Sequence, residues 1–294
     1  MLPSERQAGQ LRLAIQKEGR LTDDTLALLR AIGLEFESFR RRLFSTCRNF
    51  PLALLHTRDD DIPEYVSAGT VDLGIVGRNL LYEEGAAVEE LLPLGFGYCS
   101  LVVAVPKESP ITSTEQLAGT KIATSYPNSA QRFFNERHIP VETITISGSV
   151  EVAPHLGLSA AIVDLTATGS SLFLNDLRPI CTILESEAVL AAHPAVLADP
   201  DKKATIDRLL LRMKGVMAAK RYRYVMMNAP RSALESIKQI VPGLKMPTVV
   251  PLADPDWVAV HTAVREEVFW EVIEALRAAG ASEILVSPIE KLVL

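Results

Sequence analysis

One segment of the chain passes from a short apolar run directly into a loop of small hydroxyl residues. Residues 160–163 (Ala-Ala-Ile-Val) predict a buried strand, which ends in the carboxylate of Asp164. The loop that follows consists mainly of hydroxyl residues and one glycine, and the apolar pattern then resumes: Thr166, Thr168, Gly169, Ser170, Ser171 and Leu172. A strand, a polar turn and a helix in this order are typical of an α/β fold.

The same loop has the composition of an anion-binding cradle. Backbone N–H groups at the start of a helix converge on one point, the hydroxyls add donors, and Gly169 allows a close approach of the backbone. A carboxylate at the strand end, Asp164, can hold sugar hydroxyls beside a bound phosphate. The segment therefore favours a phosphorylated sugar over a free nucleoside triphosphate. The alternative is a plain strand-to-helix turn with an Asp or Ser cap.

Strands and helices alternate through the first part of the chain. Besides the strand at 160–163, strands are predicted at 11–15, 71–76, 99–105, 121–124 and 141–146. This alternation favours a mostly parallel sheet whose faces are covered by helices. A strongly amphipathic helix over 200–220 follows.

The rhythm changes after residue 222. The pattern there predicts the order βαββαβ, with elements at 222–227, 232–240, 248–252, 257–262, 266–279 and 283–286. This order is typical of a ferredoxin-like domain. A length of 294 residues leaves room for two or three domains.

Bulk properties exclude several classes of protein. The 30 basic and 36 acidic side chains give a net charge of −6, which argues against a nucleic-acid binder. The polar start and the lack of a long apolar run predict no signal peptide and no membrane span. Three scattered cysteines without a CxxC pair favour a reducing compartment. We therefore expect a cytoplasmic protein.

Several segments, taken in order, resemble one family. They are Gly148–Leu172, Ile-Gln-Lys-Glu-Gly-Arg-Leu at 15–21, Arg-Asp-Asp-Asp-Ile-Pro at 58–63, Val-Asp-Leu-Gly-Ile-Val-Gly at 71–77, Ile-Ala-Thr-Ser-Tyr-Pro at 122–127, Pro-Thr-Val-Val-Pro-Leu at 247–252 and Ser-Pro-Ile-Glu-Lys at 287–291. The chain resembles the ATP phosphoribosyltransferases, the first enzymes of histidine biosynthesis, in their long, histidine-regulated form.

The resemblance implies a fold and a reaction. The fold would be a two-lobed α/β region like type II periplasmic solute-binding proteins, followed by a ferredoxin-like regulatory domain at 224–294. The first lobe would comprise 1–105 with a return segment at 192–223, and the second lobe 106–191. The reaction would condense ATP with 5-phosphoribosyl 1-diphosphate to N1-(5-phosphoribosyl)-ATP and diphosphate. Mg²⁺ would arrive with the diphosphate, because the charge of the leaving group must be neutralised. The histidines and cysteines show no ligand spacing, so no metal site built by the protein alone is expected. The resemblance also implies a homo-oligomer, from dimer to hexamer.

The resemblance also implies site residues. Glu151 and Asp164 would be the catalytic acids, and either could touch Mg²⁺. The phosphoribosyl diphosphate loop would comprise Asp164, Leu165, Thr166, Ala167, Thr168, Gly169, Ser170, Ser171 and Leu172. The ATP contacts would be Lys17, Arg20, Arg58, Asp72 and Tyr126. L-histidine would act as an inhibitor and would bind near Asn228, Leu244, Thr248 and Ala263. AMP is a further candidate ligand.

Each of these residues has a simpler interpretation. Lys17, Arg20 and Glu151 are also typical of solvated turns, and Tyr126 could wedge a turn instead of stacking on adenine. Asp72, at the edge of an apolar strand, needs a partner. Two other functions remain open: a non-catalytic small-molecule receptor on the same lobes, and an amino-acid-sensing regulator with inactive lobes. Release of diphosphate from the two substrates would exclude the receptor.

Overall fold

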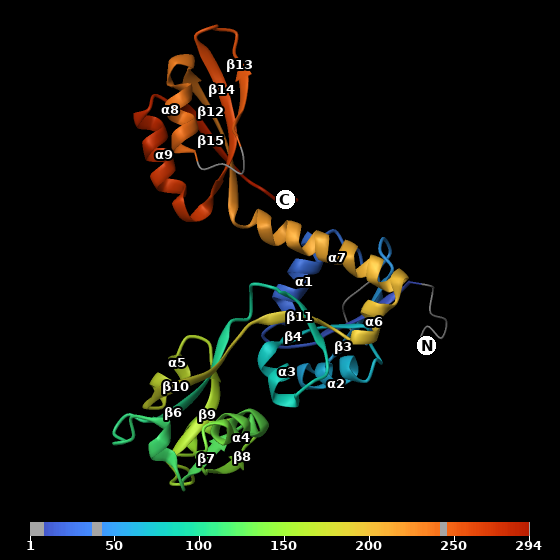
Figure 1. Ribbon diagram of the computed structural model, residues 1–294, viewed down its shortest axis with the longest axis vertical. Helices are drawn as coiled ribbons and strands as arrows, with labels where there is room; N and C mark the ends of the chain where they lie inside the picture. The colour runs from blue at the N-terminus through green and yellow to red at the C-terminus, as the bar shows by residue number, and fades with distance from the viewer. Residues whose placement is uncertain (1–8, 37–42, 242–245, 294) are drawn as a thin grey trace. The chain divides into compact units, whose positions relative to one another are not determined.

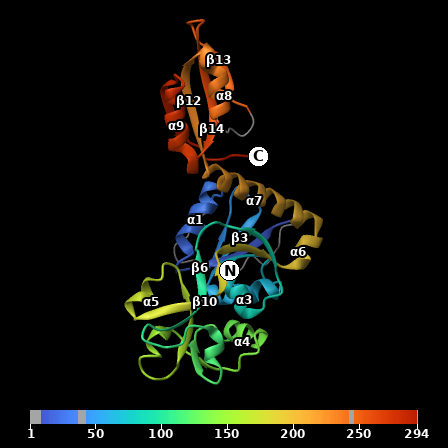
Figure 2. The same cartoon turned by 60° about the vertical axis from the view of Figure 1, so that its left-hand side comes forward.

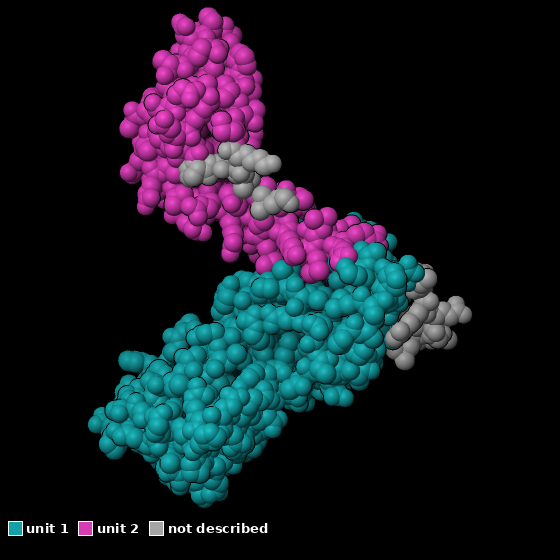
Figure 3. Space-filling model, viewed as in Figure 1, with its two compact units in different colours: residues 1–206 teal, residues 207–294 magenta. Residues whose placement is uncertain are grey.

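The computed structural model describes residues 9–36, 43–241 and 246–293. The chain forms two compact units, residues 1–206 and 207–294, which Figure 3 shows in different colours. The first unit contains two sheets, and we call the part built on each sheet lobe I and lobe II. The second unit contains one sheet.

Lobe I is built on a six-stranded sheet with the order β2-β3-β1-β4-β11-β5. Three parallel strands form its centre: β1 (Leu11–Gln16), β3 (Leu52–Thr57) and β4 (Leu73–Gly77). The remaining strands pair antiparallel with their neighbours: β2 (Phe44–Thr46) and β5 (Glu89–Pro93) at the two edges, and β11 (Ala188–Ala192) between β4 and β5. Helices α2 (Ile62–Ser67) and α3 (Arg78–Glu84) pack Ile62, Val66 and Leu80 against the sheet.

Two further helices belong to this unit: α1 (Thr22–Ala31) and α6 (Pro194–Ala198). Gly33, just after α1, has φ +77 and so ends the helix in the left-handed conformation, as its position in the sequence predicts.

Lobe II is built on a five-stranded sheet with the order β10-β6-β9-β7-β8. Its strands are β6 (Cys99–Pro106), β7 (Lys121–Thr124), β8 (Glu142–Thr145), β9 (Ala161–Thr166) and β10 (Leu177–Ser186). Strands β7, β8 and β9 are parallel, so the ends of β7 and β9 that precede Tyr126 and the hydroxyl loop lie at the same sheet edge. Helices α4 (Pro127–Glu136) and α5 (Ser170–Leu174) complete the lobe (Figure 1).

The sheets correct the expected lobe boundaries. Strand β6 pairs along its length with β9 and β10, so residues 99–105 belong to lobe II. Strand β11 pairs with β4 and β5, so residues 188–191 belong to lobe I. The break at Pro106 marks the end of a buried strand and not the passage between lobes, because the chain crosses at the start of β6 and again between β10 and β11.

The second unit contains α7 (Pro200–Ala219) from residue 207 onwards, earlier than the expected boundary at 224. Its elements then follow the predicted βαββαβ order: β12 (Tyr222–Pro230), α8 (Leu234–Ile240), β13 (Thr248–Pro251), β14 (Trp257–Arg265), α9 (Phe269–Ala278) and β15 (Ser282–Pro288). The antiparallel sheet has the order β13-β14-β12-β15, which confirms the ferredoxin-like topology. Helices α8 and α9 cover one face, where Val225, Met227 and Val260 form the core with Ile237 and Leu276 (Figure 1).

Within the described ranges, no helix is long and apolar enough to cross a lipid bilayer.

Candidate active site

A cavity of about 310 Å³ lies between lobe I and lobe II. Lobe I contributes the residues that follow the carboxyl ends of β1, β3 and β4, and lobe II contributes Tyr126 and Leu165. The full lining is Gln16, Arg20, Leu21, Asp59, Asp60, Gly77, Asn79, Leu80, Tyr126 and Leu165. Ligands of α/β proteins bind outside the carboxyl ends of the strands, so this cavity is the candidate active site.

Gln16 organises the lobe I side of the cavity. It is the last residue of β1 and is buried. Its amide nitrogen donates a hydrogen bond to Asp59 Oδ2 at 2.8 Å, and its Oε1 accepts one from the Leu21 backbone at 2.9 Å. Gly19 has φ +143, and a Cβ there would lie 2.3 Å from the Gln16 amide nitrogen, so a larger residue would be strained and would displace the Gln16 side chain. Gln16 was not among the predicted site residues, because a buried amide carries no charge signal.

The three predicted cations are all exposed, but they differ in their relation to the cavity. Arg20 lines the cavity, and its Nη2 lies 3.2 Å from Cys99 Sγ. Lys17 follows β1 and is exposed. The pKa of His56 is lowered mainly by the burial of His56 itself and further by the charge of Lys17. Arg58 is 82% exposed and lies 4.0 Å from Asp60. The structure thus places Arg20 in the cavity wall, and Lys17 and Arg58 in the segments that border the cavity.

Tyr126 is a half-buried phenol at the lobe II side of the cavity. Burial raises its pKa above the usual range, and the nearby charges of Asp164, Asp60, Cys99 and Asp59 raise it further. The hydroxyl is therefore a neutral hydrogen-bond donor at physiological pH. Its backbone N–H is fixed by the Thr124 hydroxyl at 2.8 Å, in the turn between β7 and α4.

Asp164 lies on β9 with Glu151 nearby. The pKa of Asp164 is raised to about 6. Burial is the largest cause, a hydrogen bond from the Leu165 backbone acts in the opposite direction, and the charge of Glu151 raises the pKa further. That bond, from Leu165 N to Asp164 Oδ1, measures 2.8 Å. Glu151 is half-buried and belongs to the short 3-10 helix Val150–Val152. This 3-10 helix contacts β9, so the structure places near each other the two acids that the family resemblance pairs.

The loop after Asp164 is held by hydrogen bonds between its own residues. Gly169 has φ +78, and nothing lies within 4 Å of the position that its Cβ would take. Its N–H bonds to Thr166 Oγ1 at 2.9 Å, and the hydroxyls of Thr168 and Ser170 bond to each other at 2.7 Å. Leu172 is buried and anchors α5, whereas Ala167, Thr168, Ser170 and Ser171 are exposed. The loop is therefore internally hydrogen-bonded, and the space beside Gly169 is open.

Asp72 does not join this site, and its assignment as an ATP contact is corrected. It precedes β4, whereas Gly77, which lines the cavity, ends that strand, about 16 Å away at the usual rise per residue. Its side chain is 4% exposed and pairs with Lys202 Nζ at 2.7 Å. It also accepts a hydrogen bond from the Arg12 backbone at 2.7 Å. A buried carboxylate with this partner has a structural role.

The predicted inhibitor residues share one face of the sheet in the second unit. Asn228, Thr248 and Ala263 alternate with core residues on their strands, so they lie on the face opposite α8 and α9. In the sheet register Thr248 pairs with His261, two residues from Ala263. Asn228 pairs with Ala259 instead, about 13 Å along β14 from Ala263. Leu244 lies outside the described residues.

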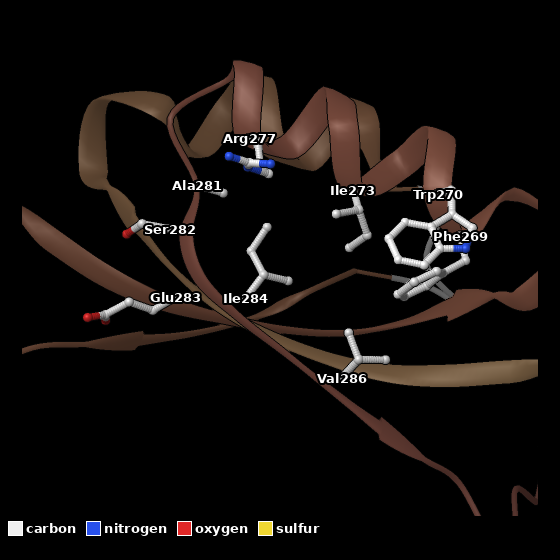
Figure 4. Close-up of a pocket in the computed structure, with 9 residues that line it drawn as sticks. All are labelled: Phe269, Trp270, Ile273, Arg277, Ala281, Ser282, Glu283, Ile284 and Val286. Carbon is white, nitrogen blue, oxygen red and sulfur yellow. The ribbon is translucent and has the colours of Figure 1, made fainter.

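The second unit has a cavity of its own, between α9 and β15, of about 370 Å³ (Figure 4). Its lining is Phe269, Trp270, Ile273, Arg277, Ala281, Ser282, Glu283, Ile284 and Val286. None of Asn228, Thr248 and Ala263 lines it, although the Asn228 amide donates a hydrogen bond to Glu283.

No cluster of three or more His, Cys, Asp or Glu side chains suited to a metal ion occurs in the part of the chain that the structure describes. Glu151 and Asp164 are a neighbouring pair of carboxylates. They could hold a cation whose other ligands come from a substrate, because hard cations such as Mg²⁺ commonly bind through one or two carboxylates and phosphate oxygens.

Known proteins are similar to this chain over most of its length. A model of the ATP phosphoribosyltransferase family matches residues 58–215, and a model of the HisG C-terminal domain matches 219–291. An ATP phosphoribosyltransferase of Cytophaga hutchinsonii is 44% identical over 96% of this chain and 98% of its own length. That of Bacteroides fragilis is 43% identical over 97% of this chain and 100% of its own length.

A solved structure also matches. The ATP phosphoribosyl transferase (HisG:HisZ) complex from Thermotoga maritima has a chain that superposes with a TM-score of 0.61 at 27% identity, covering 70% of this chain and 99% of its own. A family model over more than half of the chain and relatives at 43–44% identity over nearly all of it show that this protein belongs to the ATP phosphoribosyltransferase family.

Proposed function

We propose that this chain transfers the phosphoribosyl group of 5-phosphoribosyl 1-diphosphate to N1 of ATP, the first step of L-histidine biosynthesis. Family membership supports the reaction. The observation that carries the site is that Arg20, Asp59 and Asp60 of lobe I line one cavity with Tyr126 and Leu165 of lobe II. Leu165 directly follows Asp164 at the start of the hydroxyl loop, so a sugar phosphate on that loop would place its ribose beside the cavity.

The transfer exchanges one bond for another. The adenine N1 lone pair forms a bond to ribose C1, while the bond from C1 to the diphosphate oxygen breaks and diphosphate takes the electron pair. No covalent intermediate with the protein is required, so the protein contributes positioning and electrostatics. We assign the phosphate of the sugar to the loop 166–171 and the ribose hydroxyls to Asp164.

We assign the nucleotide to the lobe I side and to Tyr126. Arg20 lines the cavity, and Lys17 and Arg58 flank it, so the three cations can meet triphosphate oxygens. The Tyr126 ring lies at the boundary between the lobes, where it can stack on adenine.

We propose that Mg²⁺ accompanies phosphoribosyl diphosphate. When bound, the ion would neutralise the charge that develops on the leaving diphosphate. Glu151 and Asp164 would hold it, because a cation relieves the repulsion that contributes to the raised pKa of Asp164. A metal-dependence assay with EDTA and graded Mg²⁺ tests this assignment, and full turnover in EDTA would contradict it.

The direct test of the reaction is identification of the product. Incubation with both substrates should yield a nucleotide heavier than ATP by one phosphoribosyl unit, attached at adenine N1, which mass spectrometry and NMR can establish. A receptor on the same lobes would bind the substrates but form no such product, so this outcome would overturn the proposal.

We further propose that L-histidine inhibits the enzyme through the second unit, that the chain forms a homo-oligomer of two to six copies, and that it acts in the cytoplasm. The match of residues 219–291 to the C-terminal family domain supports a regulatory role, with AMP as a second candidate ligand. Three free cysteines are compatible with a reducing compartment.

Thr248→Trp should remove histidine sensitivity and spare turnover, because Thr248 is exposed on the open sheet face of the second unit. An active variant that histidine still inhibits fully would contradict the assignment.

A further inference from the structure

A buried carboxylate of lobe I is bonded to the backbone of lobe II. Glu83 lies in the last turn of α3 and is 6% exposed. Its Oε1 accepts a hydrogen bond from the Asn128 N–H at 2.9 Å, and its Oε2 accepts one from the Ser129 N–H at 2.8 Å. Both donors belong to the first turn of α4. Figures 1 and 2 show α3 and α4 side by side.

These bonds supply a helix cap that α4 lacks. The first N–H groups of a helix have no partner inside it. The residue at the N-cap position is Tyr126, whose side chain makes no capping bond, and Pro127 carries no N–H. The Glu83 carboxylate therefore caps the helix from the other lobe, and its charge also interacts favourably with the helix dipole. Because it takes both donors, this helix end is closed to a substrate phosphate.

A second tie runs parallel to the first. Arg132, one turn further along α4, donates a hydrogen bond from Nη1 to the Tyr82 carbonyl oxygen at 3.0 Å. Its guanidinium also lies 4.3 Å from the centre of the Tyr82 ring. Tyr82 and Glu83 are neighbours on α3, so two adjacent residues of lobe I hold two positions on one helix of lobe II.

The two helices of this contact also carry or adjoin residues that line the cavity. Asn79 and Leu80, at the start of α3, line the cavity from lobe I, and Tyr126, which immediately precedes α4, lines it from lobe II. A shift of the α4 N-terminus would therefore move the Tyr126 ring relative to Arg20 and Asp59. Small displacements of this kind can lower the rate of a reaction that depends on positioning.

We propose that Glu83 is a positioning residue for phosphoribosyl transfer. It holds the start of α4 against lobe I, and thereby sets the position of Tyr126 and the width of the cavity in which ATP meets the sugar. The inference rests on the proposed function. The claim that Glu83 holds the start of α4 can be measured on the protein without substrates.

The test compares Glu83→Gln with Glu84→Gln. Glutamine keeps the shape of the side chain, but it lacks the charge and offers only one acceptor oxygen. Glu84 is exposed on the same helix, so its variant makes the same charge change without the contact. Hydrogen exchange at residues 128–129 should be about tenfold faster in Glu83→Gln, since charge-assisted bonds contribute a factor of that order. Exchange in Glu84→Gln should match the wild type.

The kinetic test compares the change in KM for ATP with the change in KM for phosphoribosyl diphosphate. In Glu83→Gln we expect KM for ATP to rise about tenfold, a factor that corresponds to one lost charged hydrogen bond, with a smaller change in KM for phosphoribosyl diphosphate. A purely structural residue would lower the folded fraction and leave both KM values unchanged, and that result would overturn the proposal. If Glu83→Gln fails to fold, Arg132→Gln removes the second tie and should raise KM for ATP in the same direction. An unchanged value in folded Arg132→Gln would then overturn the proposal.

Failure of the proposed function gives a different result. A wild-type chain that forms no phosphoribosylated nucleotide contradicts the function itself. A wild-type chain that turns over, together with a folded Glu83→Gln whose exchange and KM values are those of the wild type, contradicts only the role of Glu83.

Discussion

Lys202 Nζ lies 2.7 Å from Asp72 Oδ1, at the end of the lobe I sheet opposite the cavity. Lys202 belongs to the first turn of α7, and Asp72 immediately precedes β4. With side chains that are 17% and 4% exposed, the pair is screened little by solvent. It joins the start of α7 to the lobe I sheet at the amino end of β4.

Asp72→Asn should therefore affect stability and spare chemistry. Breaking one side of a buried ion pair leaves an uncompensated charge and costs roughly 3 kcal/mol. We expect a lower thermal midpoint, with unchanged kcat and KM per folded molecule. A raised KM for ATP in a variant of normal stability would instead restore Asp72 to the nucleotide site.

Asp164→Asn should show the opposite pattern. The pKa of Asp164 is raised to about 6 in the folded protein, mainly by burial. An acid with a raised folded pKa lowers stability as pH rises between its unfolded value and its folded value. Removing the charge should therefore raise the thermal midpoint at pH 8 while turnover falls at least about a hundredfold. A destabilised variant with normal activity would identify Asp164 as a structural cap.

The pH dependence of kcat/KM should report the same carboxyl group. We expect kcat/KM to rise as Asp164 ionises near pH 6, because its role in holding ribose or a cation needs the charged form. Glu151→Gln removes the neighbouring charge and should move this rise to lower pH. The shift is partial, since burial is the larger cause. A rise that stays in place would show that Glu151 does not act on Asp164.

Gly169→Val should abolish binding of phosphoribosyl diphosphate while the fold persists. A Cβ at Gly169 would meet no atom within 4 Å, so the variant fits sterically, but φ +78 strains a β-branched residue and its methyl groups would project into the phosphate approach. Titration calorimetry should detect no binding. Gly119 is a matched control, because it has φ +77 and equally open surroundings and lies outside the site. Wild-type affinity in folded Gly169→Val would overturn the cradle assignment.

The sequence predicted local elements better than it predicted contacts between distant segments. The strand, Asp164 and the hydroxyl loop could be read from the sequence because they are consecutive, and so could the βαββαβ order of the second unit. The role of Asp72 could not be read from composition. Asp72 lies at the amino end of a parallel strand, whereas ligands bind at the carboxyl ends. The direction of the strand was therefore the one signal in the sequence that Asp72 lies away from the cavity. Gln16 and Glu83 act through contacts with distant segments, and no spacing pattern announces such contacts. The membership of β6 and β11 likewise depends on pairing between strands far apart in the chain.

Diphosphate release tests the central claim most directly. Wild-type protein should release diphosphate from 5-phosphoribosyl 1-diphosphate only when ATP is present, and Asp164→Asn, at equal folded concentration, should release it at a rate at least about a hundredfold lower. Release without ATP, no release with both substrates, or equal rates in the two proteins would contradict the account of this cavity as a phosphoribosyl transfer site.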